Sequence, residues 1–174
     1  MEIERENVGD VTVPYSALWI YHWGLTHNKT EENLLIKWTE LEIKRRGLGD
    51  INTEYTARWI FNWGLNNKKA DANMFIKWAE AEVNEDMQNI GQPEIPYTAR
   101  WIYHYGFITL KNNPNLILRW IRQEFELGNI GPADKEYTVL WLLDNLYSSG
   151  YDDRSYYYWM IGSEMSLGMV ETAY

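Results

Sequence analysis

A glycine followed six residues later by a tyrosine occurs five times in this chain of 174 residues. The five pairs are Gly9/Tyr15, Gly49/Tyr55, Gly91/Tyr97, Gly131/Tyr137 and Gly168/Tyr174. Each of the first four tyrosines is followed four residues later by a tryptophan, at Trp19, Trp59, Trp101 and Trp141. A further tryptophan follows each of these after 18 or 19 residues, at Trp38, Trp78, Trp120 and Trp159. Successive tryptophans of the first set are 40, 42 and 40 residues apart. The chain is therefore one sequence unit repeated four times, a pattern typical of stacked structural repeats.

Each unit predicts two helices. The first is expected to begin at the tyrosine, as in Tyr15 to Leu25, and to have a glycine at its C-cap; these glycines are Gly24, Gly64 and Gly106. The second is expected to begin at an N-cap residue, and the candidates are Thr30, Asp71, Asn113 before Pro114, and Asp152 or Asp153. Helical hairpins repeated at this period stack side by side. The sequence therefore predicts an all-α fold, an α-solenoid of four stacked helical hairpins with eight main helices.

The repeat also sets the expected domain organisation. A chain of this length is expected to form a single domain over residues 1–174. Its predicted subdivisions are repeat 1 at about 9–48, repeat 2 at about 49–90, repeat 3 at about 91–130, repeat 4 at about 131–168 and a C-terminal lid at 169–174. The fifth pair, Gly168/Tyr174, has no helix to follow, so Tyr174 is expected to fold back over the last unit.

Helical periodicity predicts two faces on the first helix of each unit. At 100° per residue, Trp19, Trp23 and Ile20 share an arc with Tyr15, which is expected to face inward. The opposite strip is expected to be an exposed partner-binding surface, because aromatic side chains interleaved with arginine and histidine are typical of binding hot spots. Its members are Tyr21, His22, Arg58, Phe61, Asn62, Arg100, Tyr103, His104, Asp144 and Tyr147. The alternative is a strip covered by the N-terminal arm or by a second copy in a homodimer.

Three glutamates stand out, Glu42, Glu82 and Glu124, each four residues after a second-helix tryptophan. This spacing places them within the apolar stripe, where an unpaired carboxylate costs several kcal/mol. They are expected to form a structural ladder with donors from tryptophan, tyrosine and serine or threonine side chains and from Arg58 or Arg100. The alternative is a row of titrating carboxylates or a cation site, but one repeat separates neighbouring members.

Composition excludes several classes of function. The chain has no cysteine, three separated histidines (His22, His27 and His104) and no nucleotide-binding or hydrolase motif. We therefore expect no catalytic residues, no cofactor and no metal site. A net charge of −9 disfavours direct binding to nucleic acid. The charged N-terminus and the lack of a long apolar run predict a cytoplasmic protein with no membrane association.

The function expected from this pattern is a non-catalytic protein–protein interaction module, acting as an inhibitor or adaptor through an extended aromatic and polar helical surface. Its partner is another protein. Two alternatives stay open at the level of sequence. One is an acidic inhibitor that mimics nucleic acid, of the phage anti-defence type. The other is a small-ligand binder or enzyme with an aromatic-lined groove.

Overall fold

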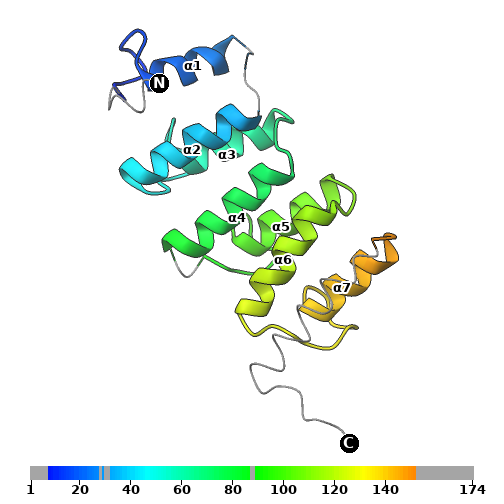
Figure 1. The fold of residues 1–174 in the computed structure, drawn as a ribbon. Helices are drawn as coiled ribbons and strands as arrows, with labels where there is room; N and C mark the ends of the chain where they lie inside the picture. Colours follow the sequence, from blue (N-terminus) through cyan, green and yellow to red (C-terminus); the bar gives the residue numbers. More distant parts are fainter. Residues whose placement is uncertain (1–7, 28, 30–31, 87–88, 152–174) are drawn as a thin grey trace, which may run out of the picture. The chain divides into compact units, whose positions relative to one another are not determined.

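The computed structural model describes residues 8–27, 29, 32–86 and 89–151, and within them the chain forms seven α-helices and no strand (Figure 1). The helices are α1 (Ala17–Thr26), α2 (Glu32–Arg46), α3 (Ala57–Asn66), α4 (Ala72–Asp86), α5 (Ala99–Thr109), α6 (Pro114–Glu126) and α7 (Val139–Ser148). The predicted all-α fold is confirmed. The eighth predicted helix with Trp159, and the lid at 169–174 with Tyr174, lie outside the described residues.

The chain divides into two compact units, residues 1–120 and 121–174. In the first unit α2 packs along α3 and α4 packs along α5, and these are the closest helix pairs (Figure 1). Smaller contacts join α1 to α2, α2 to α4 and α3 to α4. Each close pair therefore joins the second helix of one predicted repeat to the first helix of the next. In the second unit the chain continues from the end of α6 through a loop into α7.

The glycine–tyrosine spacing has a structural cause in the loop before each first helix. Ser16, Thr56, Thr98 and Thr138 are N-caps whose hydroxyls accept the backbone N–H three residues on, at 3.3 Å in every case. The glycine of each of the first four pairs has positive φ, and a Cβ on Gly9 would lie 2.2 Å from the Ser16 Cβ. Its equivalents in the later units make the same close approach to the capping threonine, at 2.3–2.6 Å. The loop can therefore close onto its own cap only where a glycine is present.

In the first four pairs, the tyrosine precedes the helix instead of beginning it. Tyr15, Tyr55, Tyr97 and Tyr137 have φ of 64–65°, a left-handed conformation that helices cannot contain. The prediction that the first helix starts at the tyrosine is wrong, and α1 begins at Ala17. The Ser or Thr that follows the tyrosine takes the N-cap position, because its short hydroxyl satisfies a free backbone N–H.

The prediction that Gly24, Gly64 and Gly106 are C-caps is also wrong. All three lie inside helices, and the C-caps are His27, Asn67 and Leu110. A Cβ on Gly64 would lie 2.3 Å from Cε of Met74 in α4 and 3.1 Å from Cδ1 of Leu35 in α2. The helical glycine is therefore explained by close helix packing.

The second helices begin and end where the sequence predicted, at the positions that the structure describes. Asp71 accepts the backbone N–H of Met74 at 2.8 Å, and Asn113 accepts that of Leu116 at 3.3 Å with Pro114 at the first helical position. Gly47, with φ of 75°, follows the last residue of α2. The other two expected N-caps, Thr30 and Asp152 or Asp153, lie outside the described residues.

Stacked aromatic rings form the core of the compact unit of residues 1–120. Trp38 of α2 lies between Tyr21 of α1 and Tyr55, with ring centroids 5.7 and 5.9 Å away and near-parallel planes. Trp78 of α4 lies in the same way between Phe61 and Tyr97, at 5.4 and 6.0 Å. Each tryptophan therefore stacks on one ring of its own sequence unit and one ring of the next. We call this arrangement the triple stack.

The buried face of the first helices differs from the predicted one. In α1 it consists of Ala17, Leu18, Tyr21 and Gly24. In α3 and α5 an isoleucine at the position of Ile20 is buried, as predicted, in place of the residue at the position of Leu18; the buried sets are Ala57, Ile60, Phe61 and Gly64, and Ala99, Ile102, Tyr103 and Gly106. Trp23 and Ile20, expected to face inward, are 41% and 42% exposed. Periodicity identified the residues that share a face, but both faces are aromatic. The small residues mark the side where a neighbouring helix approaches.

Candidate functional site

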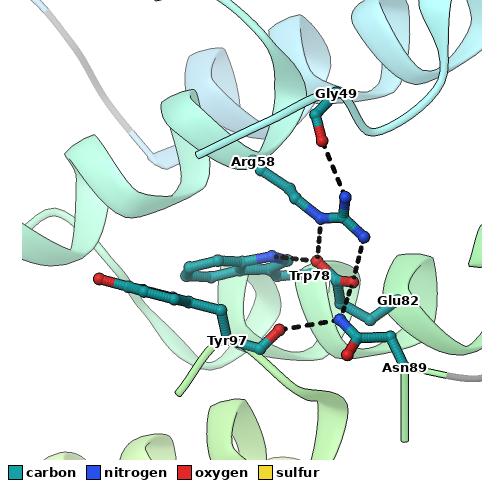
Figure 2. A network of polar contacts seen from close by, with 6 residues as sticks. All are labelled: Gly49, Arg58, Trp78, Glu82, Asn89 and Tyr97. Atoms are coloured by element: carbon teal, nitrogen blue, oxygen red, sulfur yellow. Dashed lines mark hydrogen bonds and ion pairs between the residues drawn. The ribbon is translucent and has the colours of Figure 1, made fainter. Parts of the chain in front are cut away.

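In the compact unit of residues 1–120, one buried carboxylate accepts hydrogen bonds from several side chains. Glu82 in α4 is completely buried. Arg58 of α3 donates to both carboxylate oxygens, from Nε at 2.9 Å and from Nη2 at 2.8 Å. Trp78, one turn earlier in α4, donates its indole N–H at 3.0 Å, and Asn89 in the following loop donates its amide. Figure 2 shows these donors converging on one carboxylate.

The same donors also reach the backbone of two loops. Arg58 Nη1 donates to the Gly49 carbonyl at 2.8 Å, and Asn89 Nδ2 donates to the Tyr97 carbonyl at 3.0 Å (Figure 2). The network therefore joins α3 and α4 to the loops that precede α3 and α5. Donors on both oxygens offset the cost of burying the Glu82 charge. The geometry is that of a satisfied structural ion pair.

Part of this network was expected from the sequence. Arg58 and a tryptophan N–H are among the predicted donors and take part. The threonine hydroxyls instead cap helices, and Tyr97 contributes its backbone carbonyl. Asn89 was missed, although an Asn-Ile-Gly sequence at 89–91 recurs at 129–131 and could have identified it.

In the compact unit of residues 121–174, Asn129 makes the same two kinds of contact as Asn89. Glu124 is completely buried, and Asn129 Nδ2 donates to its Oε2 at 2.7 Å. The same amide donates to the Tyr137 carbonyl at 3.0 Å. Asn129 thus holds a buried glutamate and the backbone of the next tyrosine together, as Asn89 does.

Glu42 is buried as well, but its partners are different. Arg45 Nη1 donates at 2.8 Å, and Arg46 Nε lies 4.0 Å away, both on the same helix as Glu42. Leu18 takes the place of Arg58, and Gly47 takes the place of Asn89. The nearby Trp38 indole N–H is buried and has no hydrogen-bond partner among the described residues. An unsatisfied buried donor costs about 1–3 kcal/mol, so this site is less well compensated.

An open groove of about 530 Å³ lies beside the Glu82 network. Its lining residues are Asp50, Ile51, Arg58, Asn89, Ile95, Pro96, Tyr97 and Thr98. Ile95 is 52% exposed and Tyr97 is 37% exposed, so its wall presents apolar surface to solvent. Asp50 is exposed too, and its carboxylate accepts the backbone N–H of Asn52 at 2.8 Å. The hydrogen bonds of Arg58 and Asn89 fix these two polar side chains of the lining in place.

The predicted partner-binding strip is mostly not an exposed surface. Tyr21, Phe61 and Tyr103 are buried, because each stacks on a second-helix tryptophan. The polar members His22, Asn62 and His104, together with Arg100, are half-buried. In the second unit Asp144 and Tyr147 are exposed. Three of the four aromatic members were therefore wrongly assigned to the surface, because Tyr21, Phe61 and Tyr103 lie on the face that packs against the second helices, whereas Tyr147 is exposed as predicted.

His22 and His27 contact aromatic side chains near them. His22 Nε2 and the Tyr55 hydroxyl are 3.2 Å apart, with the rings edge to face. His27 stacks on Trp23, with centroids 4.3 Å apart, and its Nδ1 lies 2.9 Å from the Trp23 carbonyl oxygen. Across the described part of the chain, no three His, Asp or Glu side chains gather as a metal site would require. Over the same residues, no helix has the length and apolar character needed to cross a bilayer.

Comparisons of the chain with protein-family models, curated proteins and solved structures found no match.

Proposed function

We propose that the chain is a non-catalytic protein–protein interaction module whose four sequence units stack into an α-solenoid. Stacking is supported by the close α2–α3 and α4–α5 pairs, and by tryptophans that contact the tyrosine of the following unit. In helical arrays of this kind equivalent loops lie along one edge, which gives an extended surface for a partner.

The observation that carries this proposal is the groove beside the Glu82 network. Its apolar wall residues, Ile95 and Tyr97, remain substantially exposed next to a polar network that is already ordered. A partner that covers them gains apolar burial, at roughly 25 cal/mol per Å². Binding would order few groove side chains, which lowers its entropic cost.

The charge around the groove favours a cationic segment of the partner. Asp50 lines the groove, and Glu54 and Glu94 are exposed in the two loops that form it. The positive charge of Arg58 is paired with Glu82. The local charge is therefore negative, as is the net charge of −9 for the whole chain. An extended segment that carries a lysine or arginine beside an apolar residue fits this groove.

The test uses Ile95→Glu, with Ile108→Glu as the matched control. Ile108 is 61% exposed on α5 and is not among the residues that line the groove. Partners would be captured from the source cells with the native chain, and the affinity of the purified partner would then be measured for all three proteins. We expect Ile95→Glu to weaken binding about tenfold or more, equivalent to about 1.4 kcal/mol. Equal affinities of the two variants would exclude the groove as the binding site.

A further inference from the structure

The C-terminal end of α5 presents an exposed surface that is both apolar and cationic. Tyr105 and Ile108 are 38% and 61% exposed, and their spacing of three residues places them on one side of the helix. Lys111 follows Ile108 by three residues in the loop after α5 and is exposed. Its side chain has no hydrogen bond or ion pair within the part of the chain that the structure describes. We call Tyr105, Ile108 and Lys111 the α5-end surface.

The groove beside the Glu82 network has the complementary chemistry. Its exposed wall residues, Ile95 and Tyr97, are apolar. The two loops that form it, residues 47–56 and 89–98, contain three acidic residues and no lysine or arginine. The acidic residues are Asp50, Glu54 and Glu94, and all three are exposed. Apolar side chains beside an unpaired lysine therefore match the groove in both polarity and charge.

The groove and the α5-end surface lie at opposite ends of one helix. Ile95 and Tyr97 precede α5, whereas Ile108 is in its last turn and Lys111 follows it. The helix has 11 residues, about 16 Å at 1.5 Å per residue. This rigid spacing keeps the two surfaces of one copy apart. A contact between them therefore requires two copies, and an antiparallel pair of copies can make the contact twice, once at each end.

We propose that the groove of one copy of this chain binds the α5-end surface of a second copy. The proposal rests on the proposed function, because it uses the same groove, and it names a second copy as an occupant. In this contact Tyr105 and Ile108 of one copy cover Ile95 and Tyr97 of the other. Lys111 then lies among the three acidic residues of the groove loops.

The test exchanges the charges of the contact and follows the association of the full chain by sedimentation velocity. Asp50→Lys and Lys111→Glu, each alone, should weaken self-association about tenfold or more, since each places like charges in the contact. An equimolar mixture of the two variants should associate again. In the mixture, the groove of each variant meets an α5-end surface of opposite charge on the other.

Lys68→Glu is the matched control. Lys68 is exposed and follows the C-cap of α3, as Lys111 follows the C-cap of α5, with φ of 56° and 51°. Its exposed neighbours are the polar residues Asn66 and Asn67, so this turn lacks the apolar part of the surface. We expect Lys68→Glu to associate as the native chain does. Circular dichroism checks that every variant is folded.

Three results would overturn the proposal. They are a native chain that stays monomeric up to about 1 mM, equal weakening by Lys68→Glu and Lys111→Glu, and a mixture of the two charge variants that stays dissociated. None of them decides the proposed function, which depends on the affinity of the captured partner for Ile95→Glu. The failure of self-association and the failure of partner binding are therefore separate observations.

Discussion

The first and second helical hairpins, α1–α2 and α3–α4, have the same aromatic core but different polar networks. In the second hairpin Glu82 receives donors from Arg58, Trp78 and Asn89. In the first, Glu42 pairs with Arg45 on its own helix. Two substitutions account for the difference, because Leu18 and Gly47 stand at the positions of Arg58 and Asn89.

This comparison shows that the stacking of the tryptophan rings does not depend on the hydrogen-bond network around the buried glutamate. Trp38 and Trp78 each lie between two aromatic rings, whether or not a network surrounds the glutamate. The network therefore adds cross-links between a helix pair and its loops to a core that is already stacked. Removing the glutamate should affect the two hairpins very differently.

The largest expected effect is the loss of stability on Glu82→Leu. The change leaves the buried parts of Arg58, Trp78 and Asn89 without their acceptor, which should cost about 3 kcal/mol or more of the free energy of unfolding. Glu42→Leu should cost less than about 1 kcal/mol, because Arg45 and Arg46 are partly exposed and can turn to solvent. Urea unfolding of both variants measures the difference. Equal losses, or a gain for Glu82→Leu, would show that the network does not stabilise the second hairpin.

A smaller contrast is expected between the helical glycines. A Cβ at Gly64 would meet Cε of Met74 at 2.3 Å, so Gly64→Ala should cost about 1–3 kcal/mol through overpacking. At Gly24 the nearest atom, Cδ2 of Leu34, would be 3.5 Å away, an ordinary contact. Gly24→Ala should therefore be neutral or stabilising by up to about 1 kcal/mol, since alanine favours the helix. Thermal unfolding of the two variants measures this difference. Destabilisation by Gly24→Ala would contradict the expectation that a Cβ fits beside Leu34.

The smallest expected effect is on alkaline stability. Burial, and then the Glu40 carboxylate, raise the pKa of Tyr21 above its usual value near 10. A raised pKa in the folded state means that the stabilisation is complete below pH 10 and is lost as the pH rises through the folded-state pKa. Phe61 occupies the same place in the second hairpin and cannot ionise. Tyr21→Phe should therefore reduce the fall in unfolding free energy above pH 10. An unchanged pH profile would mean that Tyr21 does not contribute to it.

The sequence predicted the repeated helices and the position of the buried glutamates, because both follow from spacing alone. It did not predict which face of the first helix is buried, because Trp19 and Tyr21 lie on opposite sides of a helix that is aromatic on both. Gly64 and its equivalents carried that information, since a glycine inside a helix often indicates a close neighbour. The left-handed tyrosines were missed for a different reason, since only glycine adopts this conformation readily.

The triple stack has a consequence for how such a chain can lengthen. Each of Trp38 and Trp78 takes one ring from its own sequence unit and the other from the unit that follows. A tandem duplication of one complete period of about 40 residues inserts one tryptophan together with the two rings that it needs. Copying a period therefore creates no unmatched ring within the array, wherever the duplication begins. Growth by duplication therefore leaves the stacked interior unchanged.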